Sequence, residues 1–125
     1  MQYLVGTGSV HTTAAICDYL GDRVTDDDAV IAVAVADDAT ARRDGEEALN
    51  VAPVRLAAAG DVETELRSGT PGEALLEAAA EFDADEIVIG THSGDPDAAH
   101  ELGSTARRLL TDSSRPVVVV PIPDL

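Results

Sequence analysis

Short apolar runs alternate along the chain with segments in which apolar residues recur at helical spacing. The apolar runs at residues 2–6, 30–36, 86–89 and 117–120 predict strands, and residues 62–67 alternate like a half-exposed edge strand. Residues 30–36 are apolar throughout, which is typical of a central strand covered on both faces. Five strands are therefore expected, four from continuous apolar runs and one from an alternating pattern.

Segments of helical period lie between these strands. The first has one apolar face and ends at Gly21, the second is polar and covers about residues 40–50, the third begins at Pro71, and the fourth begins near Ser104. The first face comprises Thr13, Ile16, Cys17 and Leu20, and the third comprises Ala74, Leu75, Ala78, Ala79 and Phe82. Residues 51–60 are ambiguous, because Pro53 interrupts a helical pattern that residues 56–59 could resume or carry into a strand.

The order of elements predicts the fold class. Strands that alternate with helices form a parallel sheet with helices on both faces, so residues 1–125 are expected to be one α/β domain with three α/β/α layers. Ligands of such sheets bind beyond the carboxyl ends of the strands where the strand order reverses. We expect that point between the first and fourth strands, lined by residues 6–9 and 90–105.

The charge balance narrows the choice of partners. The chain has 24 acidic and 8 basic residues, a formal net charge of −16, and no lysine, so lysine-dependent chemistry is excluded. Such an acidic surface argues against nucleic acids and anionic membranes as partners. The excess of aspartate over glutamate and the many small alanines favour a salt-adapted protein over an ordinary acidic one.

Cysteine usage and the amino-terminal sequence bear on the compartment. Cys17 is the single cysteine, which excludes an intramolecular disulfide and a metal site built from cysteines. The sequence begins without a basic region or an apolar run of signal length, and it has no run of membrane-spanning length. A cytoplasmic location is therefore expected.

Two glycine-containing segments are candidates for binding a phosphate. Gly90 ends a strand, and Gly103, Ser104 and Thr105 open a helix whose free amide groups and positive dipole end can take an anion. The hydroxyl-rich turn at residues 7–13 loosely suggests a flavin-phosphate loop, but with so few aromatic residues helix capping is the better interpretation. Ser104 is likewise better interpreted as a helix cap than as a nucleophile.

The chain resembles the universal stress protein family along nearly its whole length. The motif of that family is a glycine, two residues, a second glycine, nine residues, then glycine and a hydroxyl residue, and Gly90, Ser93, Gly103 and Ser104 have this spacing. Residues 69–75, 87–92 and 115–121 also resemble the family. The resemblance implies a Rossmann-like sheet of order 3-2-1-4-5, of the adenine nucleotide alpha hydrolase type, and an acidic, haloarchaeal-type member. The cofactor-binding positions that it implies are Thr7, Val35, Gly90, Ser93, Gly103, Ser104 and Thr105.

Three departures from the family pattern predict weakened ATP affinity. Thr7 stands where nucleotide-binding members carry an aspartate, and Ser93 stands where the second glycine belongs. Asp95, Asp97 and Glu101 are expected near the phosphates, where they repel an anion or, with Mg²⁺, hold the metal ion. ATP, AMP, another small anion and no ligand all stay open. The alternative function is a dimeric stress or scaffold protein that binds no nucleotide and acts through protein partners.

No catalytic set or dedicated metal site is expected. No nucleophile, base and orienting group are recognisable together, so the only enzymatic expectation is trace ATP hydrolysis. His92 and His100 lie in an acidic stretch and are interpreted as solvated residues rather than metal ligands.

The last strand is the expected partner surface. Four consecutive valines at a sheet edge invite pairing with another chain, and the resemblance implies a two-fold homodimer through residues 117–120. The alternative is an edge shielded by Pro116, Pro121 and the residues that follow.

Overall fold

Strands and helices alternate along residues 1–91 and 102–123, which are the residues that the computed structural model describes. In chain order the elements are β1 (Gln2–Thr7), α1 (Val10–Gly21), β2 (Ala29–Val35), α2 (Ala39–Arg55), β3 (Asp61–Arg67), α3 (Pro71–Glu81), β4 (Glu86–Gly90), α4 (Ser104–Asp112) and β5 (Val117–Val120). The predicted α/β class is confirmed, and each predicted strand is present to within one or two residues at each end.

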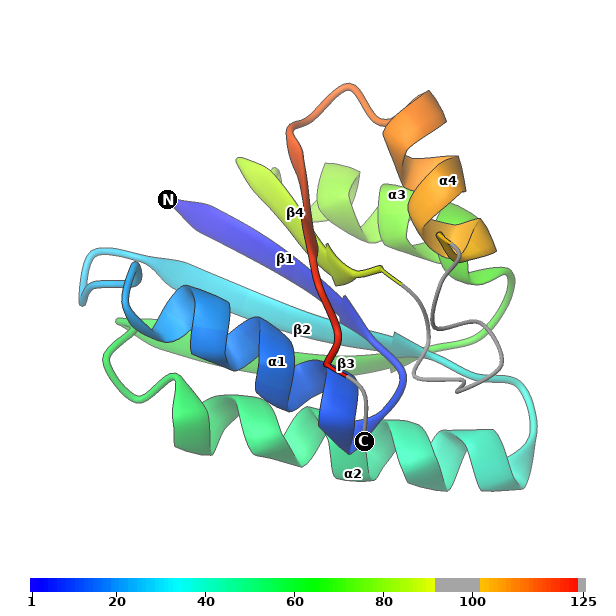
Figure 1. Ribbon diagram of the computed structural model, residues 1–125, viewed down its shortest axis with the longest axis horizontal. Coiled ribbons are helices and arrows are strands. Elements are labelled where there is room, and N and C mark those ends of the chain that lie inside the picture. The colour runs from blue at the N-terminus through cyan, green and yellow to red at the C-terminus, as the bar shows by residue number, and fades with distance from the viewer. Residues whose placement is uncertain (92–101, 124–125) are drawn as a thin grey trace.

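The five strands form one parallel sheet in the order β3-β2-β1-β4-β5. The strand order reverses between β1 and β4, as predicted, and β3 and β5 are the edges. In Figure 1, α1 and α2 cover one face of the sheet and α3 and α4 cover the other. Alternate residues of each central strand enter the two cores, so that Val5 packs on the α1 side and Leu4 on the α3 side.

Helices α1, α2 and α3 begin at residues that favour a helix amino terminus. Ser9 is the N-cap of α1 and accepts the amide of Thr12, Asp38 caps α2 by accepting the amide of Ala41, and Pro71 is the first residue of α3. The hydroxyl-rich turn is thus a capping turn, as expected. The apolar faces predicted for α1 and α3 are buried, apart from the half-buried Phe82.

Helix α2 continues beyond the predicted residues 40–50 and passes through Pro53 to Arg55. Pro53 is exposed, while Ala52 and Leu56 on either side of it are each 1% exposed within the α1-side core. The burial of these two side chains stabilises the last turn although Pro53 cannot donate a backbone hydrogen bond. The ambiguous residues 51–55 are therefore helical.

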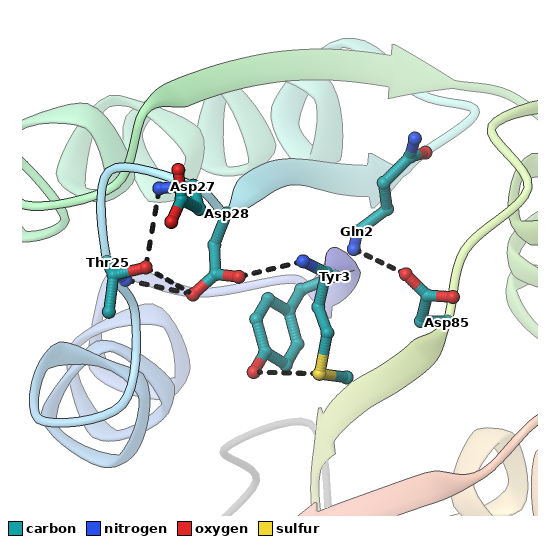
Figure 2. A network of polar contacts seen from close by, with 7 residues as sticks. Gln2, Tyr3, Thr25, Asp27, Asp28 and Asp85 are labelled. Carbon is teal, nitrogen blue, oxygen red and sulfur yellow. Dashed lines mark hydrogen bonds and ion pairs between the residues drawn. The ribbon is translucent and has the colours of Figure 1, made fainter.

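A polar network joins the amino ends of β1, β2 and β4, at the end of the sheet opposite their carboxyl ends (Figure 2). Asp28 accepts hydrogen bonds from the Met1 ammonium group at 2.8 Å and from the Thr25 amide at 2.9 Å, and Asp85 accepts from the Gln2 amide at 2.7 Å. These bonds connect β1 to the residues just before β2 and β4. In the described part of the chain, no helix has the length and apolar character needed to cross a membrane.

Candidate functional site

A cavity of about 340 Å³ opens at the carboxyl ends of β1, β2 and β4, on the side of the sheet covered by α3 and α4. Its position agrees with the expected switch point between the first and fourth strands. The described residues that line it are Gly6, Thr7, Gly8, Thr12, Val33, Val35, Pro71, Leu75, Ile89, Gly90, Thr91, Gly103, Ser104, Thr105 and Ala106.

The apolar wall of the cavity follows from the alternation of side chains along the strands. Val33, Val35 and Ile89 all belong to the α3-side core, where they meet Leu75 of α3. Gly6 occupies the same face of β1, and a Cβ atom there would lie 2.7 Å from Leu75 Cδ1. Glycine is therefore needed at this position for α3 to pack closely, and the resulting wall suits a flat apolar group.

The turn from β1 to α1 places a polar group at the cavity. Thr7 Oγ1 lies 2.7 Å from Thr13 Oγ1 and 3.2 Å from the Ser9 carbonyl oxygen, and Thr13 Oγ1 lies 3.0 Å from that same carbonyl. Two hydroxyl protons serve these three contacts. The arrangement that leaves only the longest contact without a proton has Thr13 donating to Ser9 and Thr7 donating to Thr13. Thr7, which lines the cavity, is thus held by its neighbours and carries a neutral hydroxyl group rather than a carboxylate.

The amino terminus of α4 supplies backbone donors. Gly103 is the N-cap residue, with φ −65° and ψ 159°, and its own amide donates to the Thr91 carbonyl at 2.8 Å. The first amide that bonds within the helix is that of Arg107, which donates to the Gly103 carbonyl. The amides of Ser104, Thr105 and Ala106 are thus the ones that a helix start leaves for an anion. Because the N-cap is Gly103, the expectation that Ser104 caps the helix was wrong.

Gly90 has a different role from the one that its motif suggests. It lines the cavity, but a Cβ atom on it would lie 2.7 Å from Ile122 Cδ1 and 3.2 Å from Thr12 Cγ2. The missing side chain therefore makes room for Ile122, which is 8% exposed and packs on the α1 side. Thr91 continues the pairing with β5, since its amide donates to the Val120 carbonyl at 3.1 Å.

Six of the seven predicted cofactor-binding residues line this one cavity: Thr7, Val35, Gly90, Gly103, Ser104 and Thr105. The seventh, Ser93, lies outside the described residues, as do His92, Asp95, Asp97, His100 and Glu101. Whether the six bind a ligand stays a prediction. In residues 1–91 and 102–123, no three histidine, cysteine or acidic side chains are grouped so that they could hold a metal ion.

Sequence reasoning missed several wall residues. Val33 could have been found, because it lies two residues before Val35 on the same face of β2. Pro71 and Leu75 gave no such signal, since they read as an ordinary helix start and an ordinary core position.

The thiol of Cys17 offers no nucleophile at the site. It is 3% exposed in the α1-side core, and burial raises its pKa to about 11. The thiolate, which is the reactive form, is therefore scarce at neutral pH.

Comparisons with known proteins agree with this fold. A sequence model of the universal stress protein family matches residues 4–121, and no curated protein matches the chain. A universal stress protein solved in complex with cAMP is 26% identical, with a TM-score of 0.75 and 98% of each chain covered. A family member from Burkholderia pseudomallei is 25% identical, with a TM-score of 0.67 and coverage of 96% of this chain and 95% of that chain. The universal stress protein from Archaeoglobus fulgidus in complex with dAMP is similar in fold, at 19% identity, a TM-score of 0.71 and coverage of 96% and 97%.

Proposed function

Because the chain belongs to the universal stress protein family, we propose that it is a stress-response module that binds an adenine nucleotide in the cavity between β1 and β4. The observation that carries the proposal is the pairing, in one cavity, of an apolar wall with the amino terminus of α4. The wall around Val33 and Val35 suits the base, and the amides of residues 104–106 suit a phosphate.

Two further observations support this ligand class. Related structures hold adenine mononucleotides, namely cAMP in one relative and dAMP in another. The cavity volume of about 340 Å³ is at the small end of the roughly 300–1,000 Å³ typical of ligand sites, which suits a mononucleotide. ATP is the larger candidate, and Mg²⁺ would neutralise part of its charge. The carboxylates expected to hold Mg²⁺ lie outside the described residues, so no part of the proposal depends on the metal.

The test is calorimetric titration of AMP, ADP and ATP into the protein at high KCl, with and without Mg²⁺. We expect micromolar binding of at least one nucleotide and a loss of at least about tenfold in Gly103→Val, which brings a side chain to the cavity wall. The backbone of Gly103 is extended, at φ −65°, so valine fits it without strain. Gly21→Val makes the same change at the end of α1, away from the cavity, and should bind as the wild type does. No heat with any nucleotide would overturn the proposal.

The second candidate function is a dimeric scaffold that acts through protein partners, and the edge strand β5 favours it. The carbonyls of Pro116 and Val120 accept from the amides of Ile87 and Thr91, so the carbonyls of Val117 and Val119 face away from the sheet. Val117, Val118 and Val119 are only half-buried. Antiparallel pairing of two β5 strands would cover these groups and close a two-fold dimer.

Backbone chemistry tests the dimer. Val119→Pro removes an outward amide without touching the pairing to β4, whereas Val119→Thr keeps that amide. Light scattering at micromolar protein in high KCl should give a dimer for the wild type and Val119→Thr, and a folded monomer for Val119→Pro. A monomeric wild type would remove this candidate.

We further infer that the chain binds rather than catalyses and that it works in the cytoplasm. The support is the set of neutral hydroxyl and amide groups at the cavity, together with a single, buried cysteine that suits a reducing compartment. A nucleotide turnover rate no higher than that of Gly103→Val would agree with a binding role.

A further inference from the structure

The polar groups that line the cavity, among the described residues, are all neutral. The polar side chains among the lining residues are those of Thr7, Thr12, Thr91, Ser104 and Thr105, each of which carries a neutral hydroxyl group. Sites for phosphate usually add a lysine or an arginine, whose charge attracts the ligand. Here the chain has no lysine at all, and each of its eight arginines is absent from this lining.

Neither of the two arginines on α4, Arg107 and Arg108, lines the cavity, and Arg108, which packs beside it, already has anionic partners. The side chain of Arg108 packs on Gly72, where a Cβ atom would lie 2.7 Å from Arg108 Cγ, and Gly72 follows the cavity residue Pro71. Its guanidinium group forms ion pairs with Asp112 and, at 3.7 Å, with Glu73. The charge of Arg108 is therefore matched by two carboxylates before any ligand arrives.

Other arginines are similarly engaged elsewhere on the molecule. Arg67 pairs with Glu65 and Glu81, Arg55 pairs with Asp18, and Arg115 pairs with Asp83. These contacts join α1 to α2, β3 to the end of α3, and the residue before Pro116 and β5 to the residues after α3. They stabilise the surface but bring no positive charge to the cavity.

The positive potential that the described lining supplies comes from helix starts: α4 begins there with free amides, and the first turns of α1 and α3 reach the same cavity through Thr12 and Pro71. Each helix amino terminus is equivalent to about half an elementary charge, so these three starts together compensate at most about one and a half negative charges, fewer than a polyphosphate carries. Every further phosphate charge meets the field of a protein with a net charge of −16.

We propose that the site selects among adenine nucleotides by phosphate charge and favours a phosphodiester with one negative charge over a monoester, and a monoester over a polyphosphate. This inference rests on the proposed function and names the ligand class for the same cavity. An AMP phosphate carries about two charges at neutral pH, whereas a cyclic phosphodiester carries one. The affinity order expected from charge is therefore cyclic AMP, then AMP, then ATP.

The experiment measures the affinities of adenosine, cyclic AMP, AMP and ATP by calorimetry in EDTA. The titrations are made at the lowest KCl concentration at which circular dichroism shows an intact fold, and again at 3 M KCl. At low salt cyclic AMP should bind about tenfold more tightly than ATP, and the ratio should fall to about threefold at 3 M because salt screens the repulsion. A preference set by ligand size would give a ratio that does not change with salt.

A charge variant separates the inference from its alternatives. Ser104 is exposed at the start of α4, so Ser104→Lys adds a cation beside the phosphate position, and Ser104→Gln is the neutral control of comparable length. Ser104→Lys should raise the affinity for ATP at least about fivefold more than that for cyclic AMP, and Ser104→Gln should leave the order unchanged.

Two outcomes count against the inference in different ways. ATP binding as tightly as cyclic AMP at low salt, or a ratio independent of salt, overturns charge selection and leaves nucleotide binding in place. No binding of any of the four ligands, adenosine included, overturns both the inference and the proposed function.

Discussion

Thr13 is fully buried and carries a hydroxyl group that the cavity depends on. Thr13 Oγ1 lies 2.7 Å from Thr7 Oγ1 and donates to the Ser9 carbonyl, so that it fixes the side chain of Thr7, a residue that lines the cavity. We predict that Thr13→Val weakens nucleotide binding about three- to tenfold, the value of one neutral hydrogen bond, because Thr7 is then free to rotate. Calorimetry with AMP measures this effect.

The matched control is Thr13→Ser, which keeps the hydroxyl and loses only a methyl group. It should bind AMP like the wild type, although its melting temperature should fall because a buried methyl group is removed. Equal AMP affinity in both variants would show that the hydroxyl of Thr13 has no part in positioning Thr7.

Asp28 lies at the amino ends of the strands, opposite the cavity, and it makes the stability of the protein depend on pH (Figure 2). Hydrogen bonds from the Met1 ammonium group and the Thr25 amide lower the pKa of Asp28, and the bond to Asp28 raises the pKa of the Met1 amino group. The Asp28 contribution is present above its unfolded pKa of about 3.9 and is lost as pH falls through the lower folded value. The Met1 contribution is present below its ordinary pKa of 8.0 and is lost as pH rises through the raised value.

We therefore predict that Asp28→Asn lowers the melting temperature most between about pH 5 and 8, converges with the wild type in acid, where Asp28 is protonated, and narrows the difference above pH 8, where Met1 loses its charge and the bond from Thr25 is left. The protein should carry any purification tag at its carboxyl end, so that the Met1 amino group stays free. A difference in melting temperature that is constant from pH 3 to 10 would mean that the ion pair contributes nothing.

At the scale of elements, α2 shows tertiary packing overriding a local signal. We predict that Pro53→Ala stabilises the protein by on the order of 1 kcal/mol, because it restores an amide donor within the last turn. This gain exceeds the stability that proline contributes by restricting the unfolded chain. Denaturant titration in high KCl measures the change. Pro71→Ala is the control, since Pro71 opens α3, where no intrahelical donor is needed. A stability loss in Pro53→Ala would mean that the proline fits this turn.

Helix α2 also shows which features could be predicted from the sequence alone and which could not. Apolar patterns predicted all five strands of the sheet. A short, wholly apolar run such as β2 must be buried on both faces, and the centre of a sheet is where that burial is available. It could not assign residues 51–55, since the burial of Leu56 depends on the α1-side core, which no local pattern describes. The site shows the same division. Gly103 was found through the spacing of a motif, whereas Leu75 belongs to the site only because three-dimensional packing brings it to Gly6.

At the scale of the whole molecule, the net charge of −16 opposes the fold. Two exposed charges about 10 Å apart repel by roughly 0.4 kcal/mol in water, and many such pairs exist on a chain with 24 carboxylates. At 1 M salt the screening length is about 3 Å, so most of this repulsion disappears. If screening recovers about 2 kcal/mol, the melting temperature of a domain of this size should rise by roughly 10 °C between dilute buffer and 1 M KCl.

A variant with fewer charges distinguishes charge screening from a general effect of concentrated salt. Asp44, Glu46 and Glu47 are exposed on α2, so replacing them with Asn, Gln and Gln removes three negative charges without touching the core. The triple variant should be more stable than the wild type in dilute buffer and should gain less from KCl, so that the two melting curves converge near 1 M. Salt that stabilises by being excluded from the protein surface would instead raise both proteins equally. A wild-type melting temperature that does not respond to KCl would contradict salt adaptation, because the acidic surface would then impose no cost that salt relieves.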